Sequence, residues 1–139
     1  MVPSLTPLDL VNFGMAVTIW LVQLIIYPGF TYLPKDRLVA WHARYTRRIS
    51  LVVVPLMTIQ LGLLTVLAYA GAGPAVNGML TMVLLCWGVT FKYSVPLHRR
   101  ITKGDDPVSV VPLLVKTNWP RTVLWTSVFL VGLYSRPTP

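Results

Sequence analysis

The two histidines of the chain each lie in a short polar segment beside a long apolar run. His42 falls in "WHARYTRRIS" (residues 41–50), where Tyr45 and Arg48 follow at steps of three residues. Such steps keep residues near one face of a helix, so we expect these three side chains to share a face. Histidine can act as a base or as a hydrogen-bond donor, and tyrosine and arginine can stabilise an anion. The segment therefore carries the residue types for proton abstraction beside an anion.

Two later segments carry polar groups at matching positions. "SVPLHRR" (residues 94–100) places Ser94 four residues before His98, and "NWPRTVLW" (residues 118–125) spaces Asn118, Arg121 and Trp125 as i, i+3 and i+7. We predict that these segments meet "WHARYTRRIS" at one end of a helical bundle. The residues predicted to be catalytic there are His42, His98, Tyr45, Arg48 and Arg121.

A second set of polar and aromatic residues lies deeper in the apolar runs, where polar side chains are costly and often functional. Gln23 and Gln60 lie at matching depths, roughly 13 and 15 Å from the same end at 1.5 Å per helical residue. The two amides either hydrogen-bond between helices or line a ligand pocket. The residues predicted to bind a substrate are Trp20, Gln23, Tyr27, Gln60, Asn118 and Trp125.

The acidic residues exclude several kinds of site. The chain has no glutamate, and its four acids are Asp9, Asp36, Asp105 and Asp106. A closed zinc site or a carboxylate-bridged di-iron site is therefore not expected, and no nucleotide-binding or nucleophile-elbow motif occurs. The single cysteine, Cys86, lies in an apolar run and is expected to pack as a small hydrophobic residue. We predict no cofactor, with haem ligation through His42 or His98 as a lesser alternative.

Composition places the chain in a membrane. Hydrophobic residues make up 55% of it and charged residues 12%, which is too apolar for a soluble fold of this length. The net charge of +8 comes from basic residues that cluster beside apolar runs. That pattern is typical of membrane topology and does not indicate nucleic-acid binding.

We predict an all-α, integral membrane four-helix bundle that forms a single domain over residues 1–139. Spanning a bilayer takes about 20 helical residues. The predicted helices cover residues 10–32, 50–71 with a cytoplasmic extension from about 41, 76–97 and 119–135, with a further interfacial helix over about 107–117. The segment "AGAGPAVNG" (residues 70–78) predicts a tight turn that makes the second and third helices a hairpin.

The basic residues predict the orientation. They concentrate between the first and second helices and between the third and fourth, and the opposite side carries only Arg136. Basic connections face the cytoplasm. The expected location is therefore the inner membrane of a cell, as a multi-pass protein with both termini on the periplasmic side.

Prolines recur in the halves of the helices that lie toward the basic connections. Pro28, Pro55 and Pro96 each remove a backbone donor and can kink a helix. Kinks in one layer of three helices would splay the bundle there, and such a splay could open a cavity.

Four motifs together resemble a known family. They are "IIYPGF" (25–30), "WHARYTRRIS" followed by "VPLM" (54–57), "VPLHRRITKGDD" (95–106) and "LVKTNWPRTVLWT" (114–126). They are similar to motifs of small, mostly uncharacterised bacterial four-helix membrane proteins, which in turn resemble the anthrone-oxygenase-like membrane proteins. The resemblance covers nearly the whole chain and implies the same four-helix fold.

The same resemblance implies an activity. Anthrone oxygenases add dioxygen to an activated aromatic carbanion without a metal, so His42 or His98 would be the base and Arg48 or Arg121 the partner of the anion. One position departs from the pattern, because Gln60 stands where the bacterial relatives are expected to carry an acid. Glutamine cannot accept a proton, and this departure favours binding over catalysis.

Two functions remain open at this point. The first is a site at the cytoplasmic end that binds, and in its strongest form oxidises, a lipophilic small molecule such as an aromatic or quinone-like compound. The second is a non-catalytic accessory subunit that packs within a larger membrane complex. The expected partners are membrane lipids, the lipophilic molecule, and either such a complex or further copies of the chain.

Overall fold

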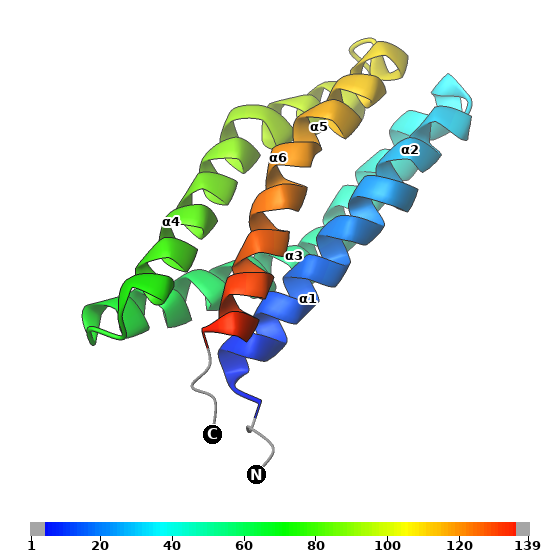
Figure 1. Cartoon of the computed structure of the whole chain (residues 1–139). Helices are drawn as coiled ribbons and strands as arrows, with labels where there is room; N and C mark the ends of the chain where they lie inside the picture. Colours follow the sequence, from blue (N-terminus) through cyan, green and yellow to red (C-terminus); the bar gives the residue numbers. More distant parts are fainter. Residues whose placement is uncertain (1–4, 136–139) are drawn as a thin grey trace.

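A computed structural model describes residues 5–135, which form an antiparallel bundle of four helical rods (Figure 1). The first rod comprises α1 (Pro7–Leu21), η1 (Val22–Ile26), α2 (Tyr27–Gly29) and η2 (Phe30–Tyr32). The second is α3 (Lys35–Tyr69). The third comprises α4 (Pro74–Val89), η3 (Thr90–Ser94) and α5 (Val95–Lys103), and the fourth is α6 (Pro107–Tyr134). The predicted all-α four-helix architecture is confirmed.

The connections between the rods use residues that permit tight turns. Gly71 and Gly73 adopt positive φ angles of 75° and 102° between α3 and α4, and Gly104 adopts a φ of 78° between α5 and α6. Only glycine takes this backbone region without a steric cost. The predicted hairpin of the second and third helices is therefore confirmed. Both ends of the described chain lie at the end of the bundle that carries the α3–α4 turn (Figure 1).

Two predicted boundaries are corrected. The second helix begins at Lys35, well before residue 41, because Pro34 starts it and no breaker follows before Pro55. The predicted interfacial helix over residues 107–117 is not separate, because it is the first part of the continuous helix α6. Pro112 and Pro120 lie inside α6 without ending it. Prolines are tolerated in packed membrane helices when neighbouring groups satisfy the freed backbone carbonyls.

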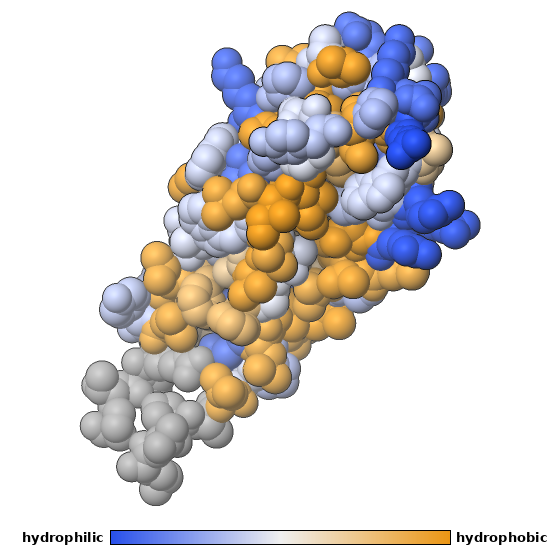
Figure 2. All heavy atoms as spheres, turned by 90° about the vertical axis from the view of Figure 1, so that its right-hand side faces the viewer, coloured by the Kyte–Doolittle hydropathy of each residue, from blue (hydrophilic) through white to orange (hydrophobic). Residues whose placement is uncertain are grey.

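Three rods are long and apolar enough to cross a membrane, namely those over Pro7–Tyr32, Lys35–Tyr69 and Pro74–Lys103. The fourth predicted span is not among them, because α6 carries Lys116, Asn118 and Arg121 near its middle. Large apolar side chains such as Leu51 and Val66 are exposed on the outside of the bundle, as expected of surfaces that face lipid. In the view of Figure 2, hydrophilic residues gather toward the end away from the termini, and hydrophobic residues cover most of the remainder. We refer to that end, where α3 begins and α5 ends and which carries Lys35, Arg37, Arg100 and Lys103, as the basic end.

The two π-helical segments correspond to two of the predicted kinks. Segment η1 ends two residues before Pro28, and η3 ends two residues before Pro96. A proline inside a helix clashes with the carbonyl four residues earlier, and a π turn accommodates that clash by widening the helix. Such π turns are frequent at functional sites. The third proline, Pro55, lies within the continuous helix α3.

Candidate functional site

The two histidines contact each other inside the basic end of the bundle. His42 on α3 and His98 on α5 are hydrogen-bonded, with 2.8 Å between His42 Nε2 and His98 Nδ1. Their rings lie nearly parallel, with centroids 5.0 Å apart. His42 has no exposed surface. One proton at most fits between two nitrogens at this distance, so the pair cannot be fully protonated on both rings.

The outer nitrogens of the pair are also hydrogen-bonded. His98 Nε2 lies 2.9 Å from the hydroxyl of Tyr27, and His42 Nδ1 lies 3.1 Å from the hydroxyl of Thr102. Four side chains from three rods thus form one continuous chain of hydrogen bonds. All four ring nitrogens are used, so neither histidine could ligate haem or a metal ion without breaking this chain. In addition, no cluster of three or more potential metal ligands occurs within residues 5–135.

Aromatic rings enclose the histidine pair. Phe30 is buried at the centre of this shell, with its ring centroid 5.4 Å from that of His42 and 5.3 Å from that of Tyr45. Tyr45 in turn stacks on Trp41 at 5.6 Å. These rings keep water away from His42. The first rod supplies Phe30 at the point where the chain leaves the bundle for the turn before α3.

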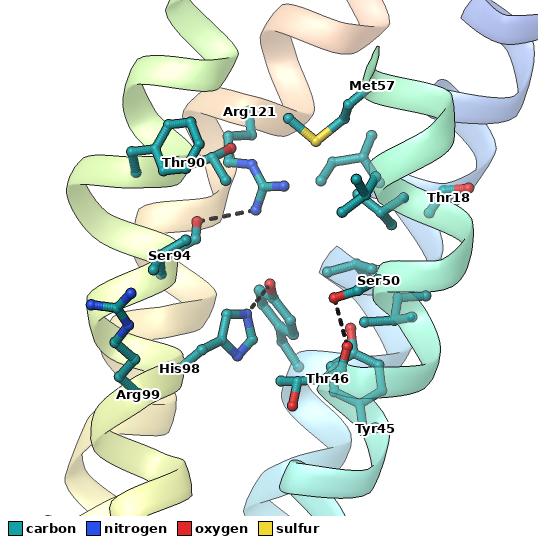
Figure 3. A pocket seen from close by; sticks show the side chains of 18 of the residues that line it. Thr18, Tyr45, Thr46, Ser50, Met57, Thr90, Ser94, His98, Arg99 and Arg121 are labelled. Atoms are coloured by element: carbon teal, nitrogen blue, oxygen red, sulfur yellow. Dashed lines mark hydrogen bonds between the residues drawn. The ribbon is translucent and has the colours of Figure 1, made fainter. Parts of the chain in front are cut away.

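A cavity of about 480 Å³ lies beside the pair, within the range of about 300–1,000 Å³ usual for small-molecule sites. Figure 3 shows that it lies between the rod of α4, η3 and α5 on one side and α3 on the other. Its inner part is apolar and includes Met15, Ile19, Met57 and Trp87, whereas Tyr27 and His98 line it closer to the basic end. Both π segments contribute lining residues. The cavity therefore lies at the depth where kinks near Pro28 and Pro96 are predicted to splay the bundle.

Arg121 of α6 reaches the cavity with few partners of its own. Only 6% of its surface is exposed, and its Nη1 donates to Ser94 Oγ at 3.1 Å and to Asn118 Oδ1 at 2.9 Å. Its guanidinium also lies over the ring of Trp125, 5.0 Å from the centroid. Figure 3 shows Arg121 pointing toward the space into which Ser94 and His98 also point. The positive charge is thus buried against uncharged partners.

Four of the five residues predicted to be catalytic come together here. His42, His98, Tyr45 and Arg121 all lie in or against the cavity. Arg48 does not, because it is exposed and is not among the lining residues. Its predicted face was wrong for a geometric reason: two steps of three residues rotate a side chain by about 120° from the starting direction on a helix of 3.6 residues per turn.

The predicted substrate-binding residues divide into four groups, of which the first three lie in or near the basic end or on the bundle surface. Tyr27 lines the cavity. Gln23 and Asn118 lie behind it, where Asn118 Nδ2 donates to Gln23 Oε1 at 2.9 Å while Asn118 Oδ1 accepts from Arg121. Trp20 lies outside the cavity, where its Nε1 donates to the Thr126 hydroxyl at 3.0 Å on the bundle surface.

Gln60 and Trp125 belong to a separate buried network nearer the termini. Trp125 Nε1 donates to Gln60 Oε1 at 2.9 Å, and Gln60 Nε2 donates to Asn12 Oδ1 at 2.7 Å. Gln60 and Gln23 therefore do not pair, and the predicted matching depth is wrong, because Gln60 contacts Asn12, which precedes Gln23 by eleven residues on the first rod. Each amide faces a different partner on the neighbouring rods. Neither amide lines the cavity, so the hydrogen-bonding alternative describes both of them.

Two site residues were missed by the sequence reasoning: Thr102 holds His42, and Trp87 lines the apolar part of the cavity. Ser94, which the sequence analysis placed at the meeting point of the segments without assigning it a role, holds Arg121. A signal for Thr102 was present, because Ser94, His98 and Thr102 are spaced at four-residue steps and so share one face of the third rod.

Comparison of the chain with known protein families, with curated proteins and with solved structures finds no match.

Proposed function

We propose that this is an inner-membrane protein whose cavity binds a lipophilic, weakly acidic small molecule, such as a phenol or a reduced quinone, and holds it as the anion beside Arg121. The observation that carries the proposal is the buried guanidinium at the wall of an apolar cavity with no acid to pair with it. None of the four acids of the chain is among the residues that line the cavity.

A charge in such a place requires an explanation. Burying an unpaired ion costs several kcal/mol, so arginines inside proteins normally face a carboxylate. Arg121 Nε and Trp87 Nε1 are also buried nitrogens without a hydrogen-bond partner among residues 5–135. An anionic ligand would supply the missing counter-charge and an acceptor. Arg99 and Lys103, which line the outer part of the cavity, add to the positive potential.

The shape of the cavity favours entry of the ligand from the bilayer. The exposed lining residues are Ser50, Val54, Phe91, Arg99, Thr102 and Lys103, all of which belong to α3 or to the third rod. The mouth therefore lies between these two rods. Its apolar part, at Val54 and Phe91, faces the lipid-exposed surface, and its basic part faces the basic end. A molecule dissolved in lipid can enter without crossing water.

The basic end supports a cytoplasmic location for the site. Basic residues of membrane proteins concentrate on the cytoplasmic side, and the turns at residues 33–34 and 104–106 are at this end. The described termini would then face the periplasm. Arg136, the one basic residue predicted on that side, lies outside the described residues.

A coloured weak acid tests the proposal. The probe is para-nitrophenol carrying a hexyl chain, and the matched non-ionisable compound is its methyl ether. Purified protein in mild detergent is titrated with each compound at a pH where the free probe is mostly protonated, and protein-free micelles serve as the blank. We expect the phenolate absorption to appear on binding to the native protein and to be lost in Arg121→Gln.

Arg48→Gln is the matched control, because it removes an arginine from the same end of the bundle but not from the cavity. It should bind as the native protein does. Equal binding of phenol and ether by the native protein would overturn the proposal. Mass spectrometry of the native preparation adds a second readout: a co-purifying lipophilic acid or its oxidised product supports the proposal, whereas stoichiometric partner proteins without a ligand favour an accessory subunit.

A further inference from the structure

We propose that Tyr27, His98, His42 and Thr102 form a proton path that carries the proton of the bound acid from the cavity to the surface of the basic end. The inference rests on the proposed function, since the proton is that of the ligand. It adds a route and a set of residues that ligand binding alone does not require.

The path is continuous. Tyr27 Oη lies 2.9 Å from His98 Nε2, His98 Nδ1 lies 2.8 Å from His42 Nε2, and His42 Nδ1 lies 3.1 Å from Thr102 Oγ1. Every step is within ordinary hydrogen-bonding distance. Three different rods supply the four groups, so the chain of bonds exists only in the folded bundle.

Every group on the path can both donate and accept a proton. A hydroxyl has one donor and two acceptor sites, and a neutral imidazole has one N–H and one free lone pair. Two arrangements of the protons are therefore consistent with the same distances. In one arrangement each group donates toward Thr102, and in the other each donates toward Tyr27. Concerted transfer along the chain converts the first into the second.

The ends of the path have the exposure that transport requires. Tyr27 and His98 line the cavity, whereas Thr102 is exposed at the mouth near the basic end. Between them His42 has no exposed surface and is not a lining residue. A ligand in the cavity therefore cannot reach His42, and neither can bulk water. His42 acts only through its neighbours and is a positioning and relay group.

Arg121 favours the outward direction. Arg121 and Tyr27 both line the cavity, and a cation attracts the oxygen of a hydroxyl and repels its hydrogen. Tyr27 should then turn its O–H away from Arg121 and donate to His98. That orientation leaves the Tyr27 oxygen free to accept the proton of the ligand.

The transfer is balanced without a redox step. The O–H bond of the ligand breaks and its proton joins Tyr27 Oη, while the former hydroxyl proton of Tyr27 moves to His98 Nε2. His98 Nδ1–H passes its proton to His42 Nε2, and His42 Nδ1–H passes its proton to Thr102 Oγ1. The former hydroxyl proton of Thr102 leaves to water. The ligand anion remains beside Arg121, and one proton has entered and one has left the path.

The test measures how fast the bound probe exchanges its proton. Protein loaded with the hexyl-bearing para-nitrophenol is perturbed by a temperature jump, and the phenolate absorption is followed as it relaxes. The key variant is His42→Gln, because a glutamine amide can still hydrogen-bond to both neighbours but cannot relay a proton. We expect its relaxation to be slower by a factor on the order of 100, the lower end of the range for a positioned proton-transfer group.

The equilibrium amount of bound phenolate should stay within about twofold in His42→Gln, because Arg121 is untouched and each tenfold change in affinity takes 1.4 kcal/mol. A matched pair tests the exit: Thr102→Val should slow relaxation and Thr102→Ser should restore it. The solvent deuterium effect on relaxation should be large in the native protein. A His42→Gln variant that relaxes at the native rate would overturn the path and show that the proton leaves through the mouth.

The two proposals fail in different ways. A native protein that forms no phenolate refutes the proposed binding function. A native protein that forms phenolate, with unchanged relaxation in His42→Gln and Thr102→Val, refutes only the proton path. Circular dichroism and the equilibrium spectrum of each variant show that it is folded and loaded before its rate is compared.

Discussion

Arg121 provides a direct test of whether its charge serves the fold or the ligand. The change is Arg121→Gln, measured in the absence of ligand. A structural arginine stabilises the bundle, so its loss should lower the free energy of unfolding. An arginine kept for a ligand is buried at a cost, and its loss should leave that free energy unchanged or raise it.

The structure allows the opposing contributions to be compared. The variant loses two hydrogen bonds to neutral oxygens, on Ser94 and Asn118, worth about 0.5–1.5 kcal/mol each or more where the donor is charged. It also loses the contact with the Trp125 ring, worth about 2 kcal/mol when desolvated. Against these stands the desolvation of an unpaired ion, several kcal/mol. We therefore expect the unfolding free energy to change by no more than about 1 kcal/mol or to increase.

The assay is thermal unfolding of purified protein in detergent, followed by far-UV circular dichroism, with and without the hexyl-bearing para-nitrophenol. At a probe concentration of 100 times the dissociation constant, the native protein should gain about 2.7 kcal/mol, and Arg121→Gln should gain little. Arg48→Gln should behave as the native protein in both conditions. A clear loss of stability in ligand-free Arg121→Gln, together with an unchanged response to the probe, would refute the reasoning.

Three further predictions follow from the described contacts. Gln60→Leu removes the partners of Asn12 Oδ1 and Trp125 Nε1 and should lower the free energy of unfolding by about 1–3 kcal/mol. Thr58→Leu, on the exposed side of α3, is the control and should not lower it. Urea titration in detergent compares the two variants. Pro96→Ala restores a backbone donor beside η3 and should favour a regular α-helix there, so the probe should bind several-fold more weakly in the absorption titration. Gly104→Val forces a branched residue into a φ of 78° and should cost about 1–3 kcal/mol, seen as a lower thermal midpoint. Orientation is tested separately by fusing reporters to the C-terminus: alkaline phosphatase should be active there, and a fluorescent protein that folds only in the cytoplasm should remain dark.

The membrane class and the number of helices were predictable from the sequence alone. The length of an apolar run depends on the bilayer thickness and not on the neighbouring helices, so runs of that length appear directly in the sequence. Positive-φ glycines and prolines similarly mark the turns, because their backbone preferences are local. The layer of the cavity followed from the same reasoning, since Pro28 and Pro96 lie at matching depths in the first and third rods, which run in the same direction.

The extent of the helices at the basic end was less predictable. Residues 107–117 look like a separate interfacial helix, because a short apolar run there follows a turn and precedes the predicted fourth helix. They are instead continuous with α6, in which Asn118, Arg121 and Thr122 are buried against the other rods. A hydropathy pattern records which residues are polar but does not record whether their polar groups are satisfied inside a bundle.

The partners of the polar side chains were decided by the tertiary structure. Spacing along one helix predicts which residues share a face, but it does not predict how far each helix is rotated about its axis or shifted along it. The pairing of Gln60 with Asn12 and Trp125, the exclusion of Arg48 and the contact between His42 and His98 all depend on that rotation. The unpaired charge of Arg121 depends on it too, because only the assembled bundle shows that none of the four aspartates, all within residues 5–135, lines the cavity.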